Sequence, residues 1–376
     1  MEKETFGFIG LGLIGGSIAR GLRSLYPECE ILAYNRSKQT LYDALEEHVA
    51  NRIFEDLDET ALHSFGACDY VFLCAPVTTN NEHMRLLVPY LSDRCILTDV
   101  GSVKSPIHKL AKELNIEDHF IGGHPMTGSE KTGFSNAAEH LLENAYYILT
   151  PTESVPKERA DRLKEIVKDL HCIPLMISPT RHDYITGAIS HLPHVIAASL
   201  VNLVHSEDED GNMKLIAAGG FKDITRIASS SAEMWQSICT TNADNISVLL
   251  DHYIESLLSI RKTITNAPTD PDAYREIYDL FDDAKHYRDS FVNKTPGRSF
   301  ESFDLYVDLK DEAGAIAGAA TLLANANINI KNIGVMHNRE FQQGALRIEF
   351  YEEKAMKAAD DLFKKNGYTV FPKHND

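Results

Sequence analysis

The chain has 376 residues, 43% of them hydrophobic and 24% charged, which suits two or three globular domains. Its formal net charge of −18 argues against nucleic acid and anionic membrane as partners, because both need a basic surface. Six cysteines without a CxxC pair indicate free thiols in a reducing compartment. A strand-like TFGFIG at residue 5 leaves no room for a signal peptide, and the longest apolar run, 192–204, is too short to cross a bilayer. We therefore expect a cytoplasmic protein.

Short apolar runs alternate with amphipathic stretches between residues 5 and 175. Runs such as YVFLCAP (70–76) are apolar throughout, as in strands that are buried on both faces of a sheet. The predicted strands are 6–9, 31–34, 70–74, 95–99, 120–122, 146–149 and 172–176, with helices such as 13–25, 38–49 and 157–170 between them. This alternation predicts a doubly wound α/β domain of the Rossmann type over residues 1–178.

The segment GFIGLGLIGGSIARGL (7–22) has the spacing GxGxxG between a predicted strand and a predicted helix, the context in which it binds a dinucleotide. Gly10 permits the tight turn, Gly12 lets the backbone approach the pyrophosphate, and Gly15 allows close helix–strand packing. The alternative is a structural glycine turn. The predicted cofactor contacts are Gly10, Gly12, Leu13, Ile14, Gly15, Asn35, Arg36, Ser37, Ala75 and Pro76.

The second predicted strand ends in AYNRS (33–37), where NAD enzymes usually have Asp or Glu for the ribose 2′-hydroxyl. Arg36 could instead pair with a 2′-phosphate. We therefore expect NAD or NADP, and the sequence favours NADP. The alternative is that Arg36 stacks on the adenine and either cofactor is accepted.

Two later loops follow strands at the carboxyl end of the sheet, where ligands bind. In LTDVGSVKSPI (97–107), Ser102 is a candidate to bond the substrate or the catalytic group, and a plain helix cap is the alternative. Asp99 and Lys104 could order this loop. In IGGHPMTGSE (121–130), His124 is a candidate base for a substrate hydroxyl, and a structural loop histidine is the alternative. Thr127, Ser129 and Glu130 could orient the substrate or close the site.

The pattern becomes entirely helical from residue 182 to about 291, with predicted helices 186–205, 214–217, 232–258 and 271–289. A helical domain of this length, 179–292, often forms an intertwined dimer. In SHLPH (190–194), His191 and His194 share one helical face, although Pro193 is unusual inside a helix. No third ligand is placed nearby, so we predict no metal and favour substrate recognition over buried structural histidines.

The segment GGFKDITRIASSSAEMWQSI (219–238) contains Lys222, Asp223, Arg226 and the sole tryptophan, Trp235. Arginine suits bidentate carboxylate binding, so Arg226 is a candidate for an anionic substrate. The alternative is an ion pair between Arg226 and Asp223. After a linker-like NKTPGRS (293–299), strands 303–309, 330–337 and 345–351 and helices 316–326 and 354–366 predict a small ferredoxin-like β-α-β-β-α-β domain at 300–376.

The motifs GFIGLGLIGGSIARGL, DVGSVK, GGHPMTGSEKTG, SHLPH and GGFKDITRIASS, in this order, resemble the prephenate dehydrogenase family over nearly the whole chain. The C-terminal segment DLKDEAGAIAGAATLLANANINI resembles an ACT domain. The resemblance implies oxidative decarboxylation of prephenate to 4-hydroxyphenylpyruvate in tyrosine biosynthesis, with the ring carboxylate leaving as carbon dioxide. It also implies feedback by tyrosine, with Asp311, Gly314 and Asn329 as candidate contacts.

The resemblance assigns roles to individual residues. His124 takes the hydroxyl proton while hydride passes to the nicotinamide, and Ser102 holds His124 or the hydroxyl. His194 and Arg226 contact the substrate, and Glu130 lies near the pocket entrance. The further substrate contacts expected are Ser129 and His191.

Three alternatives remain. Arogenate dehydrogenase is the first, although His194 after HLP is more similar to the prephenate-using members. A hydroxyacid dehydrogenase is disfavoured because the first helix of the second domain carries SHLPH and no lysine base. A non-catalytic amino-acid sensor predicts damage to the cofactor loop or the base, yet Gly10, Gly12, Gly15 and His124 are intact.

Overall fold

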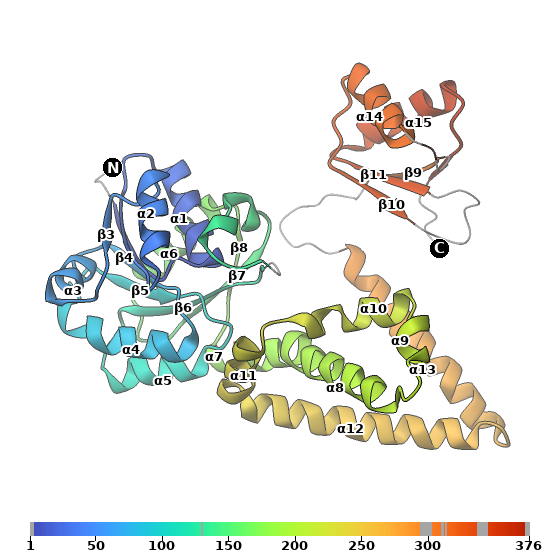
Figure 1. The fold of residues 1–376 in the computed structure, drawn as a ribbon, viewed down its shortest axis with the longest axis horizontal. Helices are drawn as coiled ribbons and strands as arrows, with labels where there is room; N and C mark the ends of the chain where they lie inside the picture. The colour runs from blue at the N-terminus through green and yellow to red at the C-terminus, as the bar shows by residue number, and fades with distance from the viewer. Residues whose placement is uncertain are drawn as a thin grey trace. The chain divides into compact units, whose positions relative to one another are not determined.

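The computed structural model describes residues 4–128, 131–293, 303–309, 312, 314–336 and 345–372. It divides into two compact units, Met1–Ser259 and Ile260–Asp376. The first unit holds a large sheet and most of the helical region, and the second holds a small sheet (Figure 1). The division into domains at 1–178, 179–292 and 300–376 stays a prediction.

The large sheet has eight strands in the order β3-β2-β1-β4-β5-β6-β7-β8. Their bounds are β1 Thr5–Ile9, β2 Glu30–Tyr34, β3 Arg52–Phe54, β4 Tyr70–Leu73, β5 Ile96–Asp99, β6 Phe120–Pro125, β7 Tyr146–Pro151 and β8 Ile173–Met176. Seven of these confirm predicted strands. The sequence missed β3, because it is three residues long and none of its side chains is buried.

The strand pairing is parallel except between β6 and β7. Among the described residues between those two strands, 126–128 and 131–145, the helical elements are two 3-10 turns, and a parallel pair usually needs a crossover through a longer helix. The Rossmann-like arrangement with a mostly parallel sheet is confirmed, and the sequence did not indicate the antiparallel pair. The antiparallel pairing also extends β6 through His124, which pairs with Ile148.

Helices cover both faces of this sheet. On one face lie α1 (Leu13–Leu25), α2 (Lys38–Glu46) and α6 (Lys157–Asp169), and on the other lie α3 (Glu59–Gly66), α4 (Val77–Leu87) and α5 (Ser105–Glu113) (Figure 1). Each face has its own buried apolar cluster. Phe8 and Phe72 stack with ring centroids 5.0 Å apart under the first group of helices, and Leu97 belongs to the cluster under the second.

The helical region begins earlier than the sequence indicated. Helix α7 (Pro179–Thr186) continues through a π-helical turn, Gly187–His191, into α8 (Leu192–Glu207), so the predicted start at residue 186 was wrong. Pro193 lies at the first turn of α8, directly after the π-helical turn, where a missing backbone N–H costs little. The predicted helix 232–258 is two helices, α11 (Ala232–Thr241) and α12 (Ala243–Asn266), separated at Asn242.

The remaining helices of this region are α9 (Asn212–Ile216), α10 (Gly219–Thr225) and α13 (Pro271–Asp289). The continuous helix Pro179–Glu207 is long and apolar enough to span a membrane by length and composition alone, and 17% of its apolar window is buried. It also carries His182, Asp183 and His191, whose side chains bond to groups elsewhere in the same unit. These contacts favour a helix of the folded helical region.

The small sheet has the strand order β10-β11-β9-β12, and its described pairs are antiparallel. Its elements are β9 Phe303–Asp308, α14 Ala315–Asn325, β10 Asn332–Met336, β11 Ala345–Phe350, α15 Glu353–Lys365 and β12 Val370–Pro372. The predicted order β-α-β-β-α-β is confirmed. Leu305 of β9, Ile348 of β11 and Phe363 of α15 belong to one buried cluster that the small sheet shares with α14 and α15.

Candidate active site

The glycine loop fits a dinucleotide. Gly10 has φ +106°, which favours glycine, and a Cβ on Gly15 would lie 2.5 Å from the carbonyl oxygen of Gly10. A Cβ on Gly12 would meet no atom within 4 Å, so the packing of the protein itself does not require glycine there. Gly12 is also the N-cap of α1 and supplies no side-chain cap. The N–H groups of the first turn of α1 are therefore suited to phosphates.

Asn35, Arg36 and Ser37 follow β2 directly. Asn35 accepts a hydrogen bond from the backbone N–H of Leu11 (3.1 Å), which ties the glycine loop to the end of β2. Ser37 caps α2 by accepting a bond from Thr40 N–H. Asn35 and Ser37 thus have structural partners, while the Arg36 side chain is exposed beside them.

The loop after β4 contains the other two predicted cofactor contacts, Ala75 and Pro76. The buried Asn80 fixes this loop, because its side chain accepts a hydrogen bond from Ala75 N–H (3.0 Å) and donates one to the carbonyl of Leu73 (3.1 Å). Sequence reasoning missed Asn80. A polar residue one turn into a predicted helix is too common to single out.

The end of β6 rests on a buried ion pair. Lys104 is 0% exposed, and its ammonium contacts the Asp99 carboxylate and donates to the carbonyl of Gly123 (2.7 Å). The other Asp99 oxygen accepts a bond from Gly123 N–H (3.2 Å). The suggestion that Asp99 and Lys104 order a loop is thus borne out, and they also fix the residue that precedes His124.

His124 lies at the carboxyl end of β6 and is partly buried. Its Nδ1 lies 2.8 Å from Nε2 of His182 on α7, which is 0% exposed. Nδ1 of His182 lies 2.8 Å from Oδ1 of Asp183. The two Asp183 oxygens also accept hydrogen bonds from the backbone N–H groups of Lys104 and Ser105, each at 2.7 Å. Three side chains and the N-terminus of α5 thus form one connected chain.

The electrostatics of this chain favour a neutral base. Burial lowers the pKa of His124 well below its ordinary value, and the neighbouring His182, Lys104 and His191 lower it further. Burial alone would raise the pKa of Asp183, but hydrogen bonds from His182, Ser105 and Lys104 outweigh it and lower that pKa. At neutral pH, His124 is therefore uncharged and Asp183 is ionised.

Sequence reasoning missed both His182 and Asp183. They occur as TRHDYITG (180–187), directly after a helix start at Pro179, and the His–Asp pair in this first turn was the available signal. Ser102 lies between β5 and α5, but the N-cap position of α5 is Lys104 and Asp183 bonds the first N–H groups. The alternative that Ser102 is a helix cap was wrong. Ser129 and Glu130 lie outside the described residues.

The structure brings the predicted histidines of the helical region together with Trp235. The rings of His194 and Trp235 stack with centroids 3.7 Å apart, and His191 meets the same indole edge-on at 6.0 Å. His191 is 1% exposed and its Nδ1 lies 3.0 Å from the Asn242 amide nitrogen. Burial lowers the pKa of His194, and the charge of Arg226 lowers it further, so Arg226 belongs to the same cluster. No group of three or more metal-ligating side chains occurs among the residues that the structure describes.

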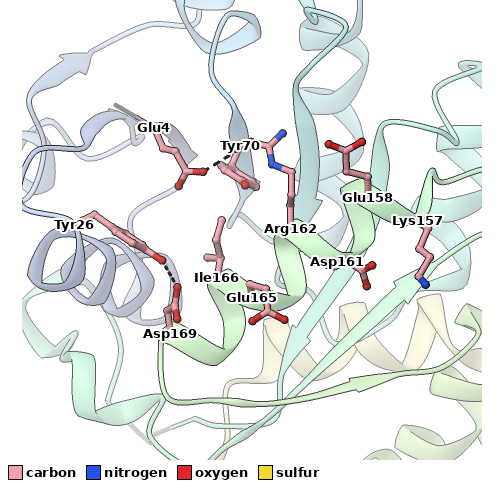
Figure 2. Close-up of a pocket in the computed structure, with 10 residues that line it drawn as sticks. All are labelled: Glu4, Tyr26, Tyr70, Lys157, Glu158, Asp161, Arg162, Glu165, Ile166 and Asp169. Atoms are coloured by element: carbon pink, nitrogen blue, oxygen red, sulfur yellow. Dashed lines mark hydrogen bonds and ion pairs between the residues drawn. The ribbon is translucent and has the colours of Figure 1, made fainter. Parts of the chain in front are cut away.

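A separate hollow of about 700 Å³ lies at the opposite end of the sheet (Figure 2). Glu4, Tyr70 and Arg162 line it together with other residues of α6, and Arg162 pairs with Glu4 at 3.8 Å. Tyr70 is the first residue of β4, so this hollow is at the amino ends of the strands. Ligands of such folds bind at the carboxyl ends, and this hollow is not part of the candidate active site.

Comparisons with known proteins agree over nearly the whole chain. The family model "Prephenate dehydrogenase, nucleotide-binding domain" matches residues 18–173, and "Prephenate dehydrogenase, dimerization domain" matches residues 178–279. Prephenate dehydrogenase of Bacillus subtilis is 36% identical over 365 residues, covering 96% of each chain. The Lactococcus lactis enzyme of the same name is 33% identical, covering 95% of this chain and 96% of its own.

Two solved structures are similar to about three quarters of the chain. Prephenate dehydrogenase of Aquifex aeolicus, in complex with hydroxyphenyl propionate and NAD+, superposes with a TM-score of 0.71 at 29% identity. That match covers 77% of this chain and 99% of the other. Arogenate dehydrogenase of Synechocystis superposes with a TM-score of 0.65 at 30% identity, covering 75% of this chain and 99% of the other.

Proposed function

The chain belongs to the prephenate dehydrogenase family, and on that premise we propose that it converts prephenate to 4-hydroxyphenylpyruvate and carbon dioxide. It is an oxidoreductase with a nucleotide-binding domain for NAD or NADP. The observation that carries the proposal is the place of His124. This histidine stands at the carboxyl end of β6, in the region of the sheet where a dinucleotide held by the glycine loop would bind, and its ring is held by His182.

His124 acts as the general base. Its neutral ring removes the proton of the prephenate hydroxyl, and the hydroxyl carbon becomes a carbonyl as its hydride leaves. A nicotinamide dinucleotide held at the glycine loop of Gly10, Gly12 and Gly15 would supply the acceptor for this hydride. The ring carboxylate then departs as carbon dioxide, and its bonding electrons complete the aromatic ring of the product. His124 returns its proton to the phenolate oxygen, so that the enzyme is restored.

The helical region supplies the substrate contacts. Arg226 binds one substrate carboxylate, and His194, stacked on Trp235, contacts the other polar end of the substrate. His191, the further proposed contact of this region, lies in the same cluster and meets the Trp235 indole edge-on. Ser102 bonds the substrate hydroxyl from the loop after β5, and Ser129 and Glu130 are further proposed substrate contacts.

The deciding experiment is an assay of the purified chain with prephenate and with arogenate, each with NAD and with NADP. We expect turnover of prephenate, and His124→Asn should lower kcat by about 10² to 10⁴ while the protein still binds the dinucleotide. Faster turnover of arogenate would make the chain an arogenate dehydrogenase. No turnover of either substrate would favour the non-catalytic sensor.

NADP is the cofactor that the exposed Arg36 favours. Its guanidinium follows β2 at the position where a ribose 2′-phosphate would lie, and the neighbouring Asn35 carries no negative charge that would repel a phosphate.

The chain forms a homodimer through its helical region. The matching family model is described as a dimerization domain. Large apolar side chains are exposed along this region, among them Leu203 (56%), Leu215 (80%) and Ile254 (46%). Exposure of many large apolar side chains in one region favours association.

The C-terminal β-α-β-β-α-β domain is an ACT domain that binds tyrosine as a feedback effector. Gly314 begins α14 in a left-handed conformation with φ +94°, and Asn329 is exposed shortly before β10. Both positions suit contacts to a small amino acid. Asp311, the third candidate contact, lies outside the described residues. Addition of tyrosine should inhibit the enzyme, and Gly314→Val should reduce that inhibition without changing kcat in its absence.

A further inference from the structure

We infer that His182 is a positioning residue that sets the tautomer of His124, and that Asp183 sets the tautomer of His182. The inference rests on the proposed function of His124 as the base. His182 and Asp183 make no contact with the substrate in this scheme. They act through His124, in the order of the hydrogen bonds that connect them.

The direction of each hydrogen bond follows from Asp183. Its carboxylate accepts bonds from the N–H groups of Lys104 and Ser105, which can only donate. The α5 N-terminus also favours a negative charge there. Asp183 is therefore an acceptor toward His182 as well, and Nδ1 of His182 carries a proton and donates it to Oδ1 at 2.8 Å.

A neutral His182 with its proton on Nδ1 has a lone pair on Nε2. Nε2 of His182 lies 2.8 Å from Nδ1 of His124, so a hydrogen bond forms between the two nitrogens only when Nδ1 of His124 is the donor. The proton of neutral His124 is then on Nδ1, and its Nε2 has the free lone pair that a general base needs. With the opposite tautomer, His124 would present an N–H group and could not accept the hydroxyl proton from that nitrogen.

Burial makes this arrangement rigid. His182 is 0% and Asp183 1% exposed, so water does not compete for their hydrogen bonds. Asn242 adds a bond from its amide to the carbonyl of Asp183 (2.9 Å), which fixes α7 at that residue. When His124 takes the substrate proton, its Nδ1–H remains bonded to His182 and the new positive charge lies near the Asp183 carboxylate.

The first test is a spectroscopic one that needs no turnover. In the full-length protein labelled with ¹⁵N-histidine, long-range ¹H–¹⁵N correlation spectra report which ring nitrogen carries the proton. The signals are assigned with His124→Asn and His182→Gln. We expect both His124 and His182 in the Nδ1–H form at pH 7.5. A His124 signal in the Nε2–H form would overturn the inference, whether or not the enzyme oxidises prephenate.

The second test is kinetic. His182→Leu removes the acceptor and should lower kcat by about 100-fold, with a KM for prephenate within about threefold of wild type. His182→Gln offers a carbonyl acceptor to Nδ1–H and should retain about tenfold more kcat than the leucine variant. Equal kcat values for the two variants would contradict the inference.

His108→Leu is the matched control. Like His182, His108 is a buried histidine. Its Nε2 lies 2.8 Å from the hydroxyl oxygen of Thr150, and it has no described bond to His124. We expect His108→Leu to lower the free energy of unfolding and to leave His124 in the Nδ1–H form. If His182→Leu does not fold, the kcat of His182→Gln and the ¹⁵N spectra still test the tautomer of His124. An inactive wild type with both rings in the Nδ1–H form would defeat the proposed reaction and leave the tautomer assignment standing.

Discussion

Lys104 and Asp99 form a fully buried ion pair beneath the strand that carries His124. Removing one partner leaves an uncompensated charge, so Lys104→Met should lower the free energy of unfolding by about 3–5 kcal/mol. Chemical denaturation in urea measures this. The double variant Lys104→Met/Asp99→Asn should recover part of the loss, because no buried charge remains. A single variant as stable as wild type would contradict the role of this pair.

Gly12 and Gly15 should respond differently to alanine. A Cβ on Gly15 would lie 2.5 Å from a backbone oxygen and 2.8 Å from Cys74, so Gly15→Ala should destabilise the fold. A Cβ on Gly12 meets nothing within 4 Å, so the free energy of unfolding of Gly12→Ala should lie within about 1 kcal/mol of the wild-type value. This substitution should nevertheless raise the Kd for the dinucleotide by at least about tenfold, a loss of about 1.4 kcal/mol. Unchanged affinity in Gly12→Ala would mean that the pyrophosphate binds elsewhere.

Arg36 should determine the choice between NAD and NADP. Arg36→Ala removes the cation available to a 2′-phosphate and should lower kcat/KM for NADP by about tenfold or more, with little change for NAD. Arg52→Ala, which removes another exposed arginine from the neighbouring strand β3, is the control. Equal losses with both cofactors would indicate that Arg36 stacks on the adenine.

Acid should destabilise the protein through its buried histidines. Burial lowers the pKa of His108 to about 3 and that of His191 to about 4. In the unfolded chain these histidines take up a proton near pH 6.5, whereas in the folded protein they stay neutral until the pH reaches the lowered pKa. The folded state therefore keeps its full stability above pH 6.5 and loses stability as the pH falls toward the folded pKa. Between pH 7 and pH 5, His108 alone should reduce the free energy of unfolding by about 2 kcal/mol.

Urea denaturation of wild type and His108→Gln at both pH values tests this. The variant should lose less stability than wild type on going from pH 7 to pH 5, since glutamine takes up no proton. Identical losses would show that His108 is not the group responsible.

The proposed homodimer should depend on exposed apolar side chains of the helical region. Leu203→Asp on α8 and Ile254→Asp on α12 each place a charge where an apolar contact is expected, and light scattering should show a shift toward the mass of one chain. Leu86→Asp is a matched control, because Leu86 is 47% exposed on α4 of the sheet domain and Ile254 is 46% exposed. An unchanged mass for both test variants would exclude this surface.

Local sequence was sufficient for most of the elements. The bounds of α1 and α13 follow from apolar periodicity, and the glycine loop follows from steric requirements at Gly10 and Gly15. Local sequence was insufficient where a contact with a distant part of the chain sets the end of a helix. The break at Asn242 depends on the bonds of its amide to Asp183 and His191, which a helical periodicity does not contain.

The same division holds for the site. The sequence by itself placed His124 directly after a strand, at the carboxyl edge of a sheet where ligands bind, because strand patterns and glycine spacing are local properties. The pairing with β7 that extends β6 through His124 was not predicted. Only the tertiary structure decided what holds its ring. His182 is 58 residues away along the chain, and it reaches His124 because Asp183 caps the N-terminus of α5. Hydrogen-bond direction depends on every partner of a group, and those partners are set by packing.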